Sequence, residues 1–138
     1  MTYPDSPVGL IENWTPKSES KIGLIWNDSK FDGGAPFLDY RINYDQGIGV
    51  YTILASNIIS KNYIAENLTP GVIYKFKVEV RNRWDYSTYS NELTVLCAFK
   101  PFAPAMPTTL VQFSDVIIDW VAPFNGGSSI TGYRVLIR

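Results

Sequence analysis

Strict alternation of apolar and charged residues is the feature that most narrows what this chain can fold into. Residues 74–81 read Tyr-Lys-Phe-Lys-Val-Glu-Val-Arg, so every second side chain is apolar and every other one is charged. Successive side chains of a β-strand point to opposite faces of a sheet, whereas a helix would scatter both sets around its circumference. The segment therefore predicts a strand with one face in a core and the charged face in water.

The same period of two recurs along the chain. Further strands are predicted at residues 22–26, 39–44, 51–54, 62–65 and 93–97. In the second of these, Asp39, Arg41 and Asn43 form the face opposite to the apolar one. Gly- and Pro-containing turns separate the segments, and no stretch has the 3.6-residue period of a helix. Several short strands divided by turns favour an all-β sandwich or barrel.

The composition excludes several classes of function. The chain has 12 basic and 13 acidic residues, no His and one Cys. These numbers leave no intramolecular disulfide, no Cys/His zinc site and no His-based acid–base pair. The balanced, interspersed charge disfavours a nucleic-acid partner, and no apolar run is long enough for a membrane span. We therefore expect a protein that is not an enzyme and has no cofactor, metal or nucleotide site.

The chain also repeats itself. Residues 22–26 return as residues 116–120, displaced by 94 positions. The turn Asp32-Gly33-Gly34 returns as Asn125-Gly126-Gly127, displaced by 93. A period of this length is the size of one domain, so it indicates a tandem array of domains rather than a fine-grained solenoid.

These landmarks resemble the fibronectin type III domain. Trp26 matches the Trp of strand B, Gly33 opens the Gly-Gly-x-Pro loop, and Tyr40 opens the Tyr-x-Ile-x-Tyr of strand C. The run from Leu68 to Tyr74 matches the family's Leu-x-Pro-x-x-x-Tyr corner. The amino-acid sequence of the repeat is also similar to that of repeats in very large multi-domain proteins of single-celled eukaryotes.

The resemblance implies an immunoglobulin-like sandwich of seven strands, with A-B-E packed against C'-C-F-G. It assigns residues 1–100 to a complete domain and residues 101–138 to strands A, B and C of a second one. The implied core markers are Trp26, Tyr40, Leu68, Pro70, Tyr74 and Trp120. The hydroxyl of Tyr74 is expected to bond to upstream backbone, and Asn82 to form a turn.

One segment is a candidate for partner contact. Its residues are Arg83, Trp84, Asp85, Tyr86 and Tyr89, in the predicted F–G loop. Exposed aromatic side chains together with Arg are common anchors of protein–protein contacts. The alternative is that Trp84 or Tyr86 packs over the edge of its own sandwich.

Three Asn-x-Ser/Thr sequons are candidates for N-glycosylation: Asn13, Asn27 and Asn67. Asn13 and Asn27 are expected on loops. Asn67 belongs to the Asn-Leu-Thr-Pro sequence that is common at the family's corner, so a structural role is expected for it. The connector at residues 99–107 carries a proline at every third position from 101. It is either a Pro-x-x-Pro ligand or, as we favour, a stiff link between domains.

The sequence thus predicts a non-enzymatic structural or adhesive repeat of an elongated protein, in a filament, surface coat or matrix-like assembly outside the cell or on its surface. The alternative is a protein-binding accessory module of an intracellular signalling or ciliary scaffold, in the cytoplasm or cilium. Residues 101–138 are expected to be completed by following residues or by a neighbouring chain. Alone they should be disordered, and about 55–60 further residues of a matching repeat should order them.

Overall fold

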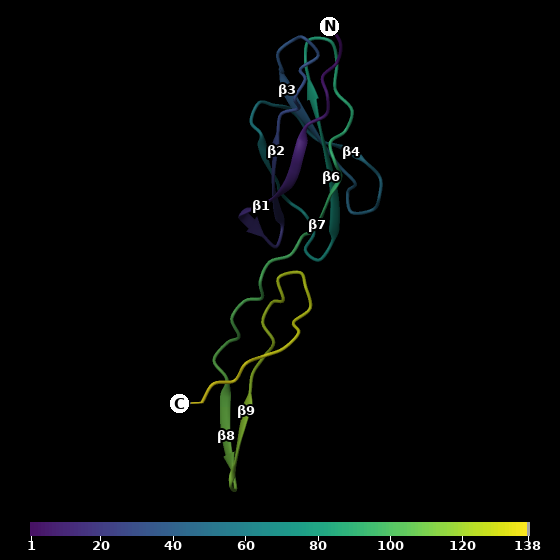
Figure 1. The fold of residues 1–138 in the computed structure, drawn as a ribbon. Coiled ribbons are helices and arrows are strands. Elements are labelled where there is room, and N and C mark those ends of the chain that lie inside the picture. The colour runs from purple at the N-terminus through teal and green to yellow at the C-terminus, as the bar shows by residue number, and fades with distance from the viewer. Residues whose placement is uncertain (138) are drawn as a thin grey trace.

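A computed structural model describes residues 1–137, and these residues form nine β-strands and no helix. The strands are β1 (Val8–Ser18), β2 (Lys21–Asn27), β3 (Asp39–Tyr44), β4 (Thr52–Ile58), β5 (Asn62–Ala65), β6 (Ile73–Arg81), β7 (Leu93–Leu96), β8 (Thr108–Gln112) and β9 (Asp115–Asp119). The first seven build a sandwich, and the last two form a separate hairpin beneath it (Figure 1). The all-β prediction is confirmed.

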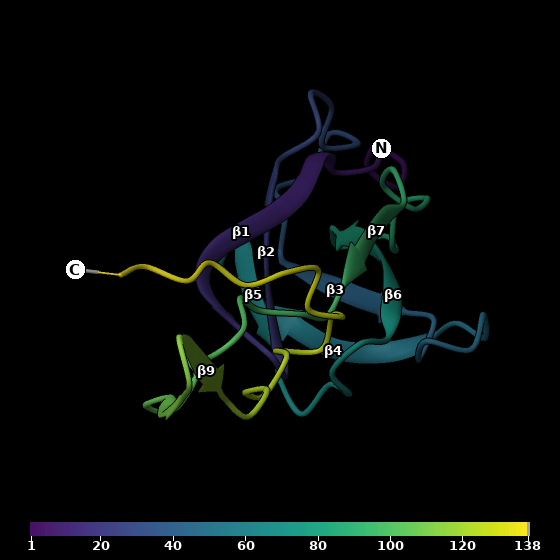
Figure 2. The same cartoon turned by 90° about the horizontal axis from the view of Figure 1, so that it is seen from below.

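Two antiparallel sheets make up the sandwich. One has the order β1-β2-β5 and the other the order β4-β3-β6-β7. Seen from below, the two sheets face each other across the core (Figure 2). This is the A-B-E and C'-C-F-G arrangement that the family resemblance implied.

The core lies where the apolar sets of the two sheets meet. From β6, Phe76, Val78 and Val80 are fully buried, and from β2 Trp26 is 1% exposed. The Trp26 ring meets the Tyr40 ring edge-on, with centroids 5.4 Å apart. The alternation in the sequence therefore identified the inner face of each central strand correctly.

The outer face of the four-stranded sheet differs from the prediction. The charged sides of β3 and β6 were expected in water, but Asp39, Asn43 and Glu79 are 7%, 5% and 6% exposed. Arg41 and Asn43 bond to the Glu79 carboxylate, and Arg81 bonds to Asp39. This charge pairing and these hydrogen bonds within the sheet offset the cost of burial.

The opening of the second copy is only partly folded as a sheet. β8 and β9 pair antiparallel from Thr108 opposite Asp119 to Gln112 opposite Asp115. Residues 120–137 contain no strand, so the predicted strand C of this copy is wrong. In the first copy β3 bonds to β4 on one side and to β6 on the other, and no strand of the described second copy can take either place.

The first copy is closed by a side chain that joins its first strand to the segment leading into its last. The Asn91 amide group donates to the carbonyl of Leu10, 3.1 Å away, and accepts the N–H of Leu10 at 3.3 Å. Leu10 is itself buried in the core. The chain then leaves β7 downward and continues into the second copy, so the molecule is elongated (Figure 1).

Among residues 1–137, no helix is long and apolar enough to cross a membrane.

Candidate protein-interaction surface

The predicted corner at Tyr74 is present. The Tyr74 hydroxyl accepts the backbone N–H of Thr69 at 3.0 Å, and Tyr74 and Leu68 are both buried. Pro70 is exposed at the tip of this corner. The hydrogen bond holds the crossover between β5 and β6, and so fixes where β6 begins.

Asn82 anchors the segment that follows β6. Its amide nitrogen donates to the carbonyls of Thr2 and Asp32, each at 2.8 Å. Its oxygen accepts the N–H groups of Trp84 and Asp85, at 2.9 and 3.3 Å. Asn82 is 1% exposed, so the start of the F–G segment is fixed by a buried and well-paired side chain.

Two serines then tie the segment to the edge of β6. Ser87 Oγ accepts the N–H of Val80 at 3.1 Å, and Ser90 Oγ accepts the N–H of Val78 at 3.0 Å. The N–H groups of the same serines bond back to the carbonyls of Val80 and Val78. Both serines are buried, and each follows a tyrosine, which brings Tyr86 and Tyr89 onto the outer face of the sheet.

Tyr86 packs against two arginines of that face. The Arg41 guanidinium carbon lies 3.7 Å from the Tyr86 ring centroid, and that of Arg81 lies 5.3 Å from it. Arg41 also binds both carboxylate oxygens of Glu79, at 2.7 and 2.9 Å, and these hydrogen bonds raise the pKa of Arg41. Tyr86 therefore packs over its own sandwich, which is the alternative to partner contact given above.

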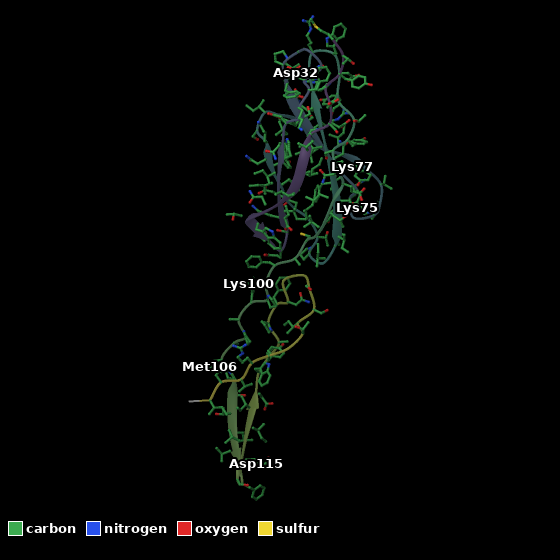
Figure 3. The ribbon with its side chains drawn as sticks, viewed as in Figure 1. Asp32, Lys75, Lys77, Lys100, Met106 and Asp115 are labelled. Atoms are coloured by element: carbon green, nitrogen blue, oxygen red, sulfur yellow. The ribbon has the colours of Figure 1, made fainter. Side chains whose placement is uncertain are left out.

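A second group surrounds Lys77. Its Nζ lies 4.2 Å from the Tyr51 ring centroid and 5.4 Å from that of Tyr89. The Tyr51 hydroxyl donates to Glu92 at 2.7 Å, and Lys75 and Lys77 lie 3.4 and 3.5 Å from the same carboxylate. The hydrogen bond from Tyr51, with the nearby lysines, holds the pKa of Glu92 below its usual range. Figure 3 labels both lysines on this side of the sandwich.

Two aromatic side chains of the segment extend into solvent. Trp84 is 56% exposed and Tyr89 is 50% exposed. Arg83 lies beside Trp84, with its guanidinium carbon 5.8 Å from the ring centroid, and Asp85 accepts the N–H of Tyr86 at 2.7 Å. The surface thus combines charge-paired side chains on the sheet with two exposed aromatic rings, and exposed aromatic residues are enriched where proteins contact one another.

The sequons occupy different settings. Asn13 lies within β1 and Asn27 ends β2, so the prediction that both sit on loops is wrong. The edge position of β1 explains why an Asn can occupy a strand there, since its outer edge faces no partner strand. Asn27 and Asn67 are exposed, and Asn67 adopts a positive φ of 57° at the corner.

Sequence reasoning missed the charged half of this surface. Arg41, Tyr51, Lys77, Glu79 and Glu92 come from strands and turns far apart in the chain. A signal was present in the repeated Tyr-Ser pair at residues 86–87 and 89–90, because each serine bonds to β6 and the tyrosine before it lies over the outer face. Residues 1–137 contain no group of His, Cys, Asp or Glu that could hold a metal ion.

Two curated relatives illustrate the sequence similarity. Mouse "Fibronectin type-III domain-containing protein 3A" is 26% identical over 144 residues, which cover 97% of this chain and 12% of that protein. Titin of Drosophila melanogaster is 27% identical over 131 residues, covering 86% of this chain and 1% of that protein. The chain therefore spans a small part of the relatives it matches.

Solved structures agree with the fold. Domains A168–A170 from titin superpose with a TM-score of 0.62 at 21% identity, over 69% of this chain and 32% of that one. The structure described as "FN3tt mut" superposes with a TM-score of 0.57 at 26% identity, over 70% of this chain and 98% of that one. The fibronectin type III domain family matches residues 6–95, which carry the sandwich from β1 to all but the last residue of β7. This chain belongs to the fibronectin type III domain family.

Proposed function

We propose that this chain is a non-enzymatic structural or adhesive repeat of an elongated multi-domain protein, in a filament, surface coat or matrix-like assembly. The observation that carries the proposal is the connection between the two copies. The second copy begins directly below the first and continues its long axis (Figure 1).

Hydrogen bonds hold the connector between the two copies against the second copy. The N–H of Phe99 donates to the carbonyl of Gly126 at 2.7 Å, and that of Phe102 donates to Phe124 at 3.0 Å. The connector therefore lies along the second copy and is hydrogen-bonded to it at two positions. Its prolines at positions 101, 104 and 107 restrict it further, because proline fixes one backbone dihedral. A short stiff connector holds neighbouring domains at a set spacing, which suits an array.

Completing the second copy provides the test. Residue 138 matches residue 45 in the repeat, so appending residues 46–97 after Arg138 supplies the equivalents of β4 to β7. Small-angle X-ray scattering of this extended chain should give a rod about two domains long. A compact particle, with the two domains folded side by side, would contradict the array function.

The exposed aromatic rings support a second role. Trp84 and Tyr89 project from a segment that buried hydrogen bonds hold in place, and rigid exposed aromatic residues are common anchors of interfaces. This favours lateral contacts with other proteins within an assembly, and it is equally the feature expected of an accessory module in an intracellular signalling or ciliary scaffold. Tyr86 contributes less, because it already stacks on Arg41.

The compartment separates these two roles. We propose an extracellular or cell-surface location, with the cytoplasm or cilium as the alternative. Mass spectrometry of the protein from its native source should find glycan on the exposed Asn27 or on Asn67. At Asn13 the side-chain oxygen accepts the N–H of Thr15, and the side-chain nitrogen, which would carry the glycan, takes no part in that bond, so Asn13 is a third candidate. Unmodified Asn at all three positions would favour the intracellular role.

A further inference from the structure

The two copies meet at a point where no side chain separates their backbones. Gly127, at φ +92°, sits against the Pro70–Gly71 corner of the first copy. A Cβ atom at Gly127 would lie 2.8 Å from the Gly71 nitrogen, 3.0 Å from the Cys97 carbonyl oxygen and 3.1 Å from the Pro70 Cβ. A Cβ at Gly71 would lie 3.0 Å from the Gly127 carbonyl oxygen. Only glycine fits at Gly127 without displacing the neighbouring copy.

The turn that carries Gly127 has a counterpart in the first copy. The N–H of Gly127 donates to the Asn125 side chain at 3.0 Å, and the N–H of Gly34 donates to the Asp32 side chain at 2.8 Å. A Cβ at the preceding glycine would meet the lead-in carbonyl at 2.2 Å in both copies. The two turns therefore share one construction.

The segments that lead into the two copies are bonded in the same way. In the first copy the N–H of Thr2 donates to Gly33 at 2.9 Å, as Phe99 does to Gly126 at 2.7 Å. The N–H of Asp5 donates to Phe31 at 3.1 Å, as Phe102 does to Phe124 at 3.0 Å. A domain ahead of the first copy would therefore be connected to it as the first copy is connected to the second.

The counterparts differ in what faces them. A Cβ at Gly34 would have only Met1 nearby, with its Cγ at 3.5 Å and its Cα at 3.9 Å, and Gly34 is exposed. The φ of +79° favours glycine there, but the backbone contact that makes Gly127 indispensable has no equivalent at Gly34 in this chain. Gly34 is thus the counterpart of Gly127, and within residues 1–137 its exposed face meets Met1 instead of a corner such as Pro70–Gly71.

We propose that the Asp32–Gly34 turn docks onto the Pro70–Gly71 corner of another copy of this module placed ahead of it. The inference rests on the proposed function as an array repeat, and it names the contact that orders the array. The two surfaces lie at opposite ends of the first copy: Figure 3 labels Asp32 at the end remote from Lys100, where the second copy begins. Contacts between two different patches repeat head to tail, so every junction of the array takes the same orientation.

A tandem chain tests the proposal. Residues 1–100 followed directly by residues 4–138 place two copies in the natural register, because Pro4 and Pro101 are equivalent. Isotopic labelling of the second unit alone allows its amide signals to be compared with those of the chain of residues 1–138. Docking should shift the signals of Asp32 to Gly34 and make both units tumble with one rotational diffusion tensor in 15N relaxation measurements.

Two substitutions test the contact, one on each of the two surfaces that meet there. Gly34→Asn in the second unit keeps a residue that tolerates positive φ but adds a Cβ to the docking face. Gly71→Asn in the first unit obstructs the same contact without altering the turn. Each should abolish the shifts at the turn and let the units tumble independently. The matched control is Gly49→Asn, where φ is +83° and a Cβ would meet nothing within 4 Å. It should leave both readouts unchanged.

The possible outcomes are distinguishable. Independent tumbling of the unsubstituted tandem chain, with no shift at Asp32 to Gly34, would overturn the proposal. Joint tumbling with shifts confined to another surface, such as the tyrosine-bearing face of the sheet, would also overturn it, while leaving the array function intact. The array function fails separately, if the completed second copy folds back beside the first in the scattering experiment.

Discussion

The two copies carry the same aromatic pair in nearly the same geometry, and only one of the pairs is buried. Trp26 and Tyr40 meet with centroids 5.4 Å apart at 66°, and Trp120 and Tyr133 meet at 5.3 Å and 61°. Trp26 is 1% exposed, whereas Trp120 is 39% exposed, unlike the core position predicted for it. The pairing of the rings thus depends on nearby sequence, while burial depends on the facing sheet.

The comparison extends to the strands. In the first copy the Tyr40 segment is a strand because β4 and β6 bond to both of its edges. In the second copy the Tyr133 segment has neither neighbour and forms no strand. Instead, a groove lined by apolar residues remains open beside it, formed in part by Met106, Ile118 and Val135. Strand formation in this module is a property of the whole sheet, not of the segment.

The largest expected effect comes from truncating the two tryptophans in turn. Trp26→Ala should reduce the free energy of unfolding of the first copy by about 3–5 kcal/mol, because it leaves a large cavity in the core. Trp120→Ala should change it by less than about 0.5 kcal/mol, since Trp120 lies outside that core. Denaturant unfolding followed by circular dichroism compares the two. Equal losses would show that the copies fold as one unit.

Completing the second copy should remove much of this contrast. In the chain extended by residues 46–97, Trp120→Ala should cost about 2 kcal/mol or more, since the ring then faces a second sheet. The amide hydrogens of β8 and β9 should also exchange more slowly in the extended chain than they do in the chain of residues 1–138. If Trp120→Ala remained neutral in the extended chain, the second copy would not share the core of the first.

A smaller effect is expected at the corner, which the described part of the second copy lacks. Tyr74→Phe should cost about 1–2 kcal/mol, because it leaves the N–H of Thr69 without its partner. The matched control is Tyr89→Phe, where the ring is half exposed and the change should fall within error. Urea melts of both variants decide the point, and a neutral Tyr74→Phe would remove the corner's energetic role.

The smallest expected effect is a dependence on pH that arises at Asp28 of the first copy. Burial raises the pKa of Asp28, but hydrogen bonds from Lys61 at 2.5 Å and from Tyr40 outweigh it, so the pKa lies below its ordinary value of 3.8. The matching position in the second copy is Ala122. The folded state therefore favours the carboxylate, and the stabilisation is present above pH 3.8 and lost as the pH falls through the lowered pKa.

Thermal unfolding between pH 6 and pH 2 measures this contribution. Asp28→Asn should flatten the acid side of the profile, because it removes the carboxylate to which Lys61 and Tyr40 donate. Parallel profiles for Asp28→Asn and the unsubstituted chain would assign the acid sensitivity to other carboxylates.

The sequence predicted the inner faces of the sandwich better than the outer ones. The alternation around Phe76 identified the core side of β6. Every second side chain of the strand packs against the facing sheet, so the buried side chains recur with a period of two residues. It failed for Glu79 because Arg41 and Asn43 bond to that carboxylate and Tyr86 stacks on Arg41 from a later part of the chain. The position of Tyr86 over Arg41 depends on the path of the loop after β6, and a loop has no regular sequence pattern from which that path could be predicted.

The Asn91 link between Leu10 and the last strand has a mechanical consequence. In a polymer pulled at both ends, tension enters the domain ahead of β1 and leaves it beyond β7. The two hydrogen bonds of Asn91 join these ends of the load path, at 3.1 and 3.3 Å. Both bonds must break before β1 can separate from the segment ahead of β7, so this one amide group resists the extension of a stretched repeat.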